Sequence, residues 1–184
     1  MWDDDIKQAV QYLRHGKIIA YPTEAVYGFG CDPYNETALK KLLDLKQRPW
    51  EKGLILIAAD FTQLEPFLQP LTSELKTKLF ASWPGAITWL LPAKIDVSHY
   101  LRGNSNKLAV RVTAHPQVVD LCRQWGKALV STSANTSMMP PATTALEIED
   151  KFDKEIVYIL PGKVGDRQRP SEIRDALSDK ILRN

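Results

Sequence analysis

Residues 54–59 read Leu-Ile-Leu-Ile-Ala-Ala, the longest unbroken apolar run in the chain. Because the run is apolar on both of its alternating faces, it predicts a central strand that is covered on both sides. Its six residues suit a buried strand and fall far short of the ~18 residues that a membrane-spanning helix needs. The run therefore indicates a sheet at the centre of the protein with further layers on both faces.

Short apolar strands and amphipathic helices alternate on either side of this run. Strands are expected at residues 17–21, 87–91, 107–112, 128–131 and 156–160, and helices at 4–14, 35–45, 61–68, 72–80, 116–125 and 145–152. Such alternation indicates an α/β sheet. The connection 98–106 shows no helical pattern, which favours some antiparallel pairing. We therefore expect one domain over residues 1–184, an open mixed sheet flanked by helices.

Composition and charge exclude several classes of protein. The 184 residues carry 24 Lys and Arg against 22 Asp and Glu, a net charge of +2, so no strong overall field favours nucleic acid or a membrane. Cys31 and Cys122 cannot form a disulfide scaffold and suit a reducing compartment, so we expect a cytoplasmic protein. The acidic start of the chain, with no apolar segment behind it, is not typical of a signal peptide.

Several common catalytic motifs are missing from the sequence. There is no Walker-type phosphate loop, and Pro33 stands where a dinucleotide fingerprint needs its third glycine. His15, His99 and His115 are too far apart for metal-ligand spacing. We therefore predict no metal ion bound by protein side chains.

The segment 21–28, Tyr-Pro-Thr-Glu-Ala-Val-Tyr-Gly, follows the first expected strand. Pro22 ends the strand ladder, so Thr23 and Glu24 stand at a strand end, where α/β sheets bind ligands. The alternative is an ordinary turn in which Thr23 caps a helix.

A cationic motif, Lys46-Gln47-Arg48-Pro49, closes the second helix. Pro49 favours an extended Arg48, and residues two apart in extended chain point the same way. Lys46 and Arg48 are therefore expected to converge, with Lys52 close behind. Such a group of cations suits a triphosphate or a carboxylate. The alternative is a solvated helix end whose cations interact with the helix dipole.

Neutral polar side chains follow the expected strand at 128–131. Ser131, Ser133 and Asn135 alternate onto one face of an extended chain and suit phosphate and ribose oxygens. No His or Lys lies near them in sequence to activate a nucleophile. The alternative is a serine-rich loop with an Asx turn.

Arg111 lies in the otherwise apolar strand 107–112, where a guanidinium is costly unless it is paired. Either Glu24 or another acid pairs with it, or a ligand carboxylate or phosphate does. The surrounding stretch 102–127 holds five basic residues against one acid, so it is locally basic.

Taken together and in this order, the segments resemble the YrdC/TsaC family. The motifs that carry the resemblance are 21–28, Lys46-x-Arg48-Pro49, Pro84-Gly85-x-x-Thr88, Val110-Arg111, 131–135 and Pro170-Ser171. They span residues 17–175, and the length suits the short bacterial form. Two positions depart from the pattern: Glu172 stands where many relatives have Thr, and Met138 where many have Gly.

The resemblance implies an open, twisted sheet with a large, positively lined cavity. It implies an L-threonylcarbamoyladenylate synthase, which converts ATP, L-threonine and bicarbonate or CO2 into threonylcarbamoyl-AMP and diphosphate, with Mg²⁺ assisting. It also implies partner proteins that transfer the threonylcarbamoyl group to adenosine 37 of tRNAs reading codons that start with A.

The resemblance further implies roles for individual residues. Lys46 and Arg48 would be catalytic and would bind the nucleotide together with Ser131, Ser133, Asn135 and Ser171. L-Threonine would contact Thr23, Lys52, Thr88 and Arg111.

Two other functions remain as alternatives. The first is a module that binds double-stranded RNA or tRNA without catalysis, in which the basic stretch 102–127 tracks phosphates. The low net charge and the lack of an aromatic stacking platform disfavour it. The second is a carbamoyl-transfer module like that of the hydrogenase-maturation carbamoyltransferases, disfavoured by the lack of accompanying acylphosphatase and zinc-finger segments.

Overall fold

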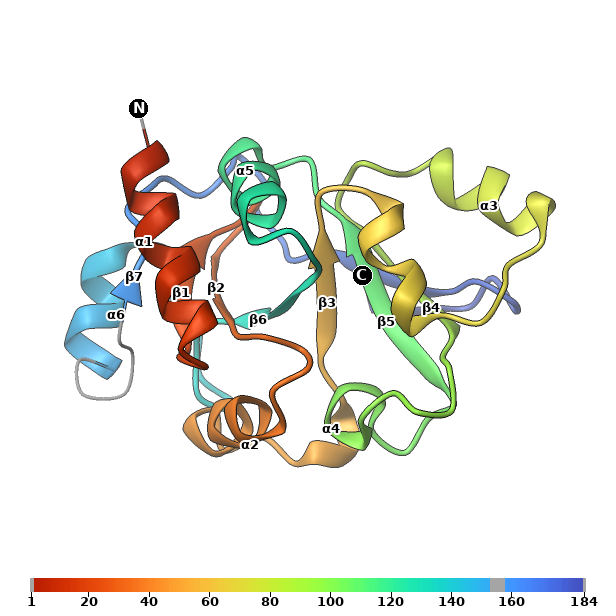
Figure 1. The fold of residues 1–184 in the computed structure, drawn as a ribbon, viewed down its shortest axis with the longest axis horizontal. Coiled ribbons are helices and arrows are strands. Elements are labelled where there is room, and N and C mark those ends of the chain that lie inside the picture. Colours follow the sequence, from red (N-terminus) through yellow and green to blue (C-terminus); the bar gives the residue numbers. More distant parts are fainter. Residues whose placement is uncertain (1, 153–157, 184) are drawn as a thin grey trace.

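The computed structural model describes residues 2–152 and 158–183 (Figure 1). The strands are β1 (Ile19–Pro22), β2 (Tyr27–Gly30), β3 (Ile55–Ala58), β4 (Ile87–Pro92), β5 (Lys107–Val112), β6 (Leu129–Ser133), β7 (Tyr158–Ile159), β8 (Glu172–Asp175) and β9 (Ile181–Arg183). They form one sheet in the order β7-β1-β2-β6-β3-β5-β4-β8-β9. Parallel and antiparallel neighbours both occur, so the expected mixed sheet is confirmed.

β3 occupies the middle of the sheet, as the apolar run at 54–59 predicts. It pairs in parallel with β5 and antiparallel with β6. Leu56 packs into one hydrophobic cluster and Ile57 into another, because successive side chains of a strand point to opposite faces. Burial on both faces explains why this strand has no polar residue.

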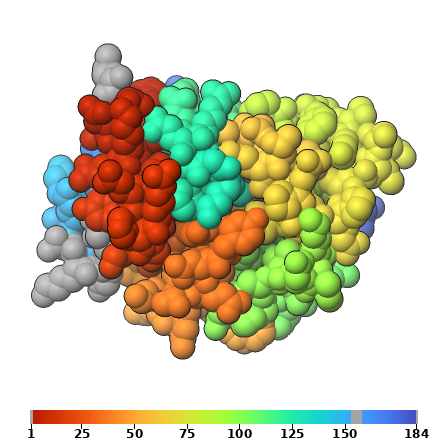
Figure 2. Space-filling model, viewed as in Figure 1, coloured from red at the N-terminus to blue at the C-terminus, as the bar shows by residue number. Residues whose placement is uncertain are grey.

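Helices cover the two faces of the sheet. They are α1 (Asp3–Arg14), α2 (Glu36–Leu45), α3 (Ser73–Phe80), α4 (His99–Arg102), α5 (Pro116–Trp125) and α6 (Ala145–Phe152). α1 and α5 lie side by side over the face that carries Ile57 (Figures 1 and 2). α2, α4 and α6 contribute to the cluster on the opposite face, which carries Leu56. Within the described ranges, none of these helices has the length and hydrophobicity to cross a membrane.

Local sequence explains the helix boundaries. The Asn35 carboxamide oxygen accepts from the backbone N–H of Ala38 at 3.0 Å and caps α2. Three aspartates place negative charge in the first turn of α1, where it interacts favourably with the positive end of the helix dipole. Pro116 begins α5, and Gly126, with φ 83°, ends it.

Several sequence predictions differ from the structure. The sequence gives no signal for β2, because the glycines in Tyr27–Gly30 lower its strand propensity. A Cβ on Gly30 would lie 2.6 Å from the Val130 carbonyl oxygen, so a side chain there would clash. The connection 98–106 does contain a helix, the four-residue α4 capped by Ser98, although β4 and β5 are antiparallel as expected.

Two further predicted elements differ from the structure or are described only in part. The segment 61–68 forms two short 3-10 helices, Phe61–Gln63 and Glu65–Phe67, with Pro66 inside the second. Of the strand expected at 156–160, the structure describes residues 158–160, and residues 153–157 lie outside the described ranges. That one domain spans all of residues 1–184 stays a prediction.

Truncating the central strand tests its position. Leu56 is 0% exposed, so Leu56→Ala should lower the free energy of unfolding by about 2–5 kcal/mol, through lost burial and a cavity. Urea denaturation followed by circular dichroism measures the change. The control Leu146→Ala, at a residue 69% exposed, should change stability by less than about 0.5 kcal/mol. Equal effects of the two variants would contradict the central placement of β3.

Candidate functional site

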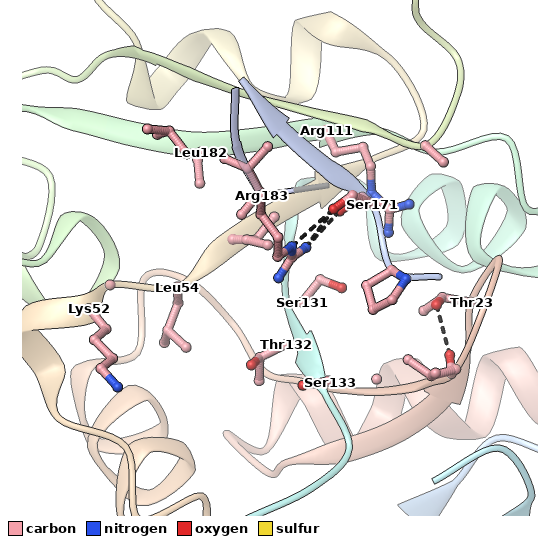
Figure 3. Close-up of a pocket in the computed structure, with 18 of the residues that line it drawn as sticks. Thr23, Lys52, Leu54, Arg111, Ser131, Thr132, Ser133, Ser171, Leu182 and Arg183 are labelled. Atoms are coloured by element: carbon pink, nitrogen blue, oxygen red, sulfur yellow. Dashed lines mark hydrogen bonds between the residues drawn. The ribbon is translucent and has the colours of Figure 1, made fainter. Parts of the chain in front are cut away.

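A cavity of about 480 Å³ opens over one end of the central strands (Figure 3). Ile55 on β3 and its register partners Ala109 and Ser131 line it. Ile55 lies on the same face as Ile57, but α1 and α5 cover only the Ile57 end of that face. The cavity is therefore the uncovered end of a face that is otherwise buried.

The remaining walls come from segments far apart in the chain. They include the turn between β1 and β2, the segment after α2, the stretch 167–171 and β9. Backbone bonds hold the stretch before β8 against the β1–β2 turn: Gly165 N–H donates to Thr23 O at 2.9 Å, and Arg167 N–H to Glu24 O at 3.1 Å. A volume of this size is ordinary for a small-molecule site.

Cationic side chains dominate the lining. They are Arg48, Lys52, Arg102, Lys107, Arg111, Arg167, Arg169 and Arg183, against the acidic Glu24 and Glu51. Arg111 pairs with Glu24, and Lys107 pairs with Asp175. The remaining positive charge suits a ligand that carries phosphate or carboxylate groups.

The site residues expected from the sequence fall into two layers. Those that line the cavity are Thr23, Arg48, Lys52, Arg111, Ser131, Ser133 and Ser171. Lys46, Thr88 and Asn135 lie behind them. Thr88 Oγ1 is 2.8 Å from Ser171 Oγ, and both Lys46 and Asn135 contact Ser133. The structure thus brings all of the predicted residues to one place, although three of them stand one layer back.

Lys46 is 3% exposed, so the alternative of a solvated helix end is wrong for this residue. Its Nζ donates to the carbonyl oxygens of Ser133 and Asn135, the latter at 2.7 Å, and to Asn135 Oδ1 at 3.1 Å. Burial, and then the nearby charge of Arg48, lower the pKa of Lys46 to about 7. The three acceptors oppose this shift, because they stabilise the ammonium.

Arg48 is the motif cation that reaches the cavity. Its Nε donates to Gly53 O at 3.1 Å, and its Nη2 donates to Lys52 O at 3.3 Å. These bonds tie the guanidinium to the loop that carries Lys52. Partial burial lowers the pKa of Arg48, but an arginine stays charged at neutral pH.

Thr23 closes the turn between β1 and β2 and does not cap a helix. Its Oγ1 donates to Val26 O at 2.7 Å, and its backbone N–H donates to the same oxygen at 3.0 Å. Because the Thr23 hydroxyl donates its proton to Val26 O, Oγ1 can only accept a hydrogen bond from a ligand in the cavity.

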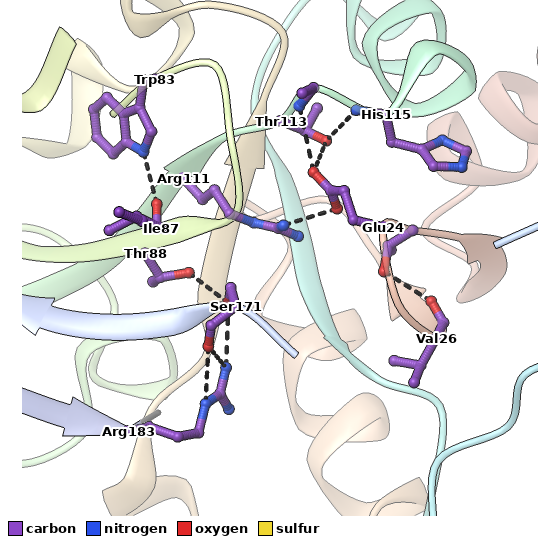
Figure 4. A network of polar contacts seen from close by, with 12 residues as sticks. Glu24, Val26, Trp83, Ile87, Thr88, Arg111, Thr113, His115, Ser171 and Arg183 are labelled. Atoms are coloured by element: carbon purple, nitrogen blue, oxygen red, sulfur yellow. Dashed lines mark hydrogen bonds and ion pairs between the residues drawn. The ribbon is translucent and has the colours of Figure 1, made fainter. Parts of the chain in front are cut away.

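Arg111 and Glu24 form the buried ion pair that the sequence raised as one possibility (Figure 4). Glu24 Oε2 is 2.7 Å from Arg111 Nη1, and Glu24 Oε1 accepts from Thr113 Oγ1 at 2.7 Å. Burial alone would raise the pKa of Glu24, but the charge of Arg111 and the Thr113 hydrogen bond outweigh it and hold that pKa below its usual range. Arg111 Nε is buried and has no hydrogen-bond partner among the described residues.

Sequence reasoning missed five cations of the lining: Arg102, Lys107, Arg167, Arg169 and Arg183. Arg183 donates from Nη2 to Ser171 O at 2.7 Å and to Ser171 Oγ at 3.2 Å. Burial, together with the charges of Arg111 and Arg48, lowers the pKa of Arg183, so three guanidinium groups converge here. The basic count over 102–127 signalled Arg102, whereas nothing in the mixed tail signalled Arg183.

An open cationic cavity on a mixed sheet defines an α/β protein that binds an anionic small molecule. The family model Sua5_yciO_yrdC, described as telomere recombination, matches residues 11–184, and the chain belongs to this family. The family expected from the sequence is thereby confirmed.

Relatives of known name extend the comparison. A threonylcarbamoyl-AMP synthase from Photobacterium profundum is 50% identical, over 98% of this chain and 98% of the relative. One from Nitrosococcus oceani is 52% identical, over 97% and 96%. The crystal structure of P. abyssi Sua5 complexed with L-threonine has a TM-score of 0.90 at 30% identity, covering 97% of this chain and 53% of that one. The chain thus spans about half the length of that Sua5.

The Glu24 carboxylate predicts a pH dependence of stability. Its pKa is lowered in the folded state, so its contribution is present above the unfolded pKa of about 4.3 and is lost as pH falls through the folded value. Glu24→Gln should therefore be less stable than wild type at pH 7, and the difference should shrink below pH ~4. Urea titrations at both pH values measure it, with the exposed Glu149→Gln as control. A difference that is equal at both pH values would refute this role.

Proposed function

We infer that this protein is a threonylcarbamoyl-AMP synthase, which joins ATP, L-threonine and bicarbonate or CO2 into threonylcarbamoyl-AMP and releases diphosphate. The observation that carries the inference is the cationic cavity, which gathers the family motifs in a chain about half identical to synthases over nearly its full length. The product serves the formation of threonylcarbamoyladenosine in tRNA.

The chemistry matches a site without an activated nucleophile. The threonine amine first forms a carbamate, with loss of water if it reacts with bicarbonate or of a proton if it reacts with CO2. In the adenylating step, an oxygen of this carbamate group forms a bond to the α-phosphorus while the bond to diphosphate breaks. Alignment and charge neutralisation lower such a barrier, and neither needs a covalent intermediate. Of the two motif cations, Arg48 lines the cavity whereas Lys46 lies behind it. We therefore assign charge neutralisation on the phosphates to Arg48.

The two substrates are assigned to different walls of the cavity. The nucleotide would contact Arg48, Ser131, Ser133 and Ser171, with Lys46 and Asn135 supporting them. L-Threonine would lie near Thr23, Lys52 and Arg111, with Thr88 behind Ser171. Arg111 lines the cavity, and its guanidinium suits a carboxylate, since a guanidinium can bind one through two parallel hydrogen bonds.

We propose that Mg²⁺ enters with ATP and is held mainly by phosphate oxygens and water. Among the residues that the structure describes, no cluster of three or more His, Cys, Asp or Glu could hold a metal ion. This fits Mg²⁺ bound through substrate phosphates, which takes few protein ligands. The ion would add positive charge at the phosphates.

Beyond the reaction itself, we propose that partner proteins collect the labile product and transfer it to tRNA. We place the protein in the cytoplasm, where Cys31 and Cys122, both free and buried, would stay reduced. The RNA-binding alternative loses support, because the basic stretch 102–127 does not form one surface. Its members Arg102, Lys107 and Arg111 line the cavity.

The reaction predicts a strict substrate requirement. Diphosphate release from ATP should need both L-threonine and bicarbonate, since the attacking group forms from these two. A coupled diphosphate assay with each substrate omitted in turn measures it. Equal turnover without threonine, or none with the complete mixture, would exclude the synthase function.

Removing the cavity cation tests the assignment of Arg48. Arg48→Ala should lower kcat/KM by ~100-fold or more, because the charge that stabilises the transferring phosphoryl group is lost. The exposed Arg123→Ala serves as control and should retain wild-type turnover. Thermal unfolding of both variants checks that they fold. Near-wild-type turnover of a folded Arg48→Ala would remove Arg48 from the catalytic machinery.

A further inference from the structure

The Lys46 ammonium is fully engaged by the protein itself. An ammonium has three N–H donors, and three acceptors surround this one: Ser133 O, Asn135 O and Asn135 Oδ1. Its nitrogen also lies 5.8 Å from the centre of the Phe29 ring. Lys46 is not among the residues that line the cavity. No donor of this cation is left over for a ligand.

The same contact fixes the orientation of the Asn135 carboxamide. Because the ammonium form of Lys46 can only donate, the Asn135 atom that faces it must be the oxygen. Asn135 Nδ2 then donates to Met139 O at 2.6 Å, which agrees with this orientation. The amide is therefore held at both ends.

The orientation of Asn135 in turn determines what Ser133 offers to the cavity. Ser133 Oγ lies 2.6 Å from Asn135 Oδ1, and because that oxygen can only accept, the Ser133 hydroxyl must donate to it. Asn135 lies behind the cavity wall, whereas Ser133 lines the cavity. Ser133 Oγ consequently presents acceptor lone pairs to a ligand.

A second set of bonds ties the loop back to the same residue. Ser137 N–H donates to Lys46 O at 2.8 Å, and Ser137 Oγ donates to Lys46 O at 3.1 Å and to Gln47 O at 3.0 Å. The side chain of Lys46 thus binds one part of the loop 133–137 and its carbonyl binds the other. The loop is attached to the end of α2 at two points.

We propose that Lys46 is a positioning residue for nucleotide binding, which touches no substrate but fixes the loop 133–137 and, through Asn135, makes Ser133 Oγ an acceptor toward the cavity. The proposal rests on the proposed function, because ATP is the ligand whose binding the loop supports. A ligand O–H or N–H would donate to Ser133 Oγ.

The two possible roles of Lys46 predict different kinetics. Loss of a cation that stabilises the transition state lowers kcat. Loss of a positioning residue for the nucleotide raises the Kd and KM for ATP and leaves kcat nearly unchanged. For Lys46→Met we expect a rise of up to ~10-fold in the Kd for ATP, the size of effect that one lost hydrogen bond produces.

A double-mutant cycle with Ser133→Ala tests the route of the effect. If Lys46 acts by orienting Ser133 Oγ, Lys46→Met should raise the Kd for ATP less in the Ser133→Ala background than in wild type. If Lys46 touched ATP directly, the two losses would multiply to ~100-fold. Titration calorimetry with ATP measures Kd, and the diphosphate assay measures KM and kcat.

Matched variants complete the experiment. Lys41→Met removes an exposed lysine of α2 and should leave both Kd and kcat unchanged. Should Lys46→Met not fold, Asn135→Ala carries the test, because it removes the acceptor of the Ser133 hydroxyl and should raise the Kd for ATP with kcat retained. Multiplicative losses, a selective fall in kcat, or an unchanged Kd in Asn135→Ala would each overturn the proposal. Failure of the wild-type protein to bind ATP would instead refute the proposed function.

Discussion

The ion pair between Arg111 and Glu24 is the interaction on which the cavity depends. Arg111 lies on β5 and Glu24 in the turn between β1 and β2, so the pair reaches across the intervening strands β6 and β3. It joins the half of the sheet that carries the turn to the half that carries β4, β8 and β9. A buried charge without its counter-charge is strongly destabilising, so removal of either partner would destabilise the fold.

The same pair explains how the site can be cationic and still fold. Glu24 neutralises the most deeply buried guanidinium and occupies its Nη1, while Nε has no partner in the part of the chain that the structure describes. The other cations of the lining are more exposed than Arg111, so water screens them more. Arg48, Arg111 and Arg183 nonetheless repel one another, and an anionic ligand relieves that repulsion. Substrate binding and folding stability are therefore coupled through charge.

Much of the fold could be predicted, because short-range sequence patterns determine its main strands and helices. The apolar run 54–59 placed the central strand, and the periodicity of 107–112, 116–125 and 145–152 gave those elements their observed bounds. β2 was not predicted, because its glycines allow a close approach between strands and have low strand propensity. The motifs predicted the family and the residues of the site, but not which of these residues line the cavity and which lie behind its wall.

Lys46 shows why the layering could not be predicted. A lysine at a helix end is usually solvated, and the acceptors that bury this one come 87 and 89 residues later in the chain. No local pattern records such a contact. Arg183 is a similar case, since only the fold brings the end of the chain to Ser171 and into the cavity.

Because β9 forms one wall of the cavity, the site cannot be complete until β9 has been synthesised. Thr23 and Glu24 are made long before Arg183, which lines the same cavity. Contacts between such distant residues close slowly, because a long loop must first be ordered. A nascent chain that has already built β3 and its neighbours therefore still lacks one wall of its site. The ligand cavity is completed only after β9 has been made and has joined the sheet.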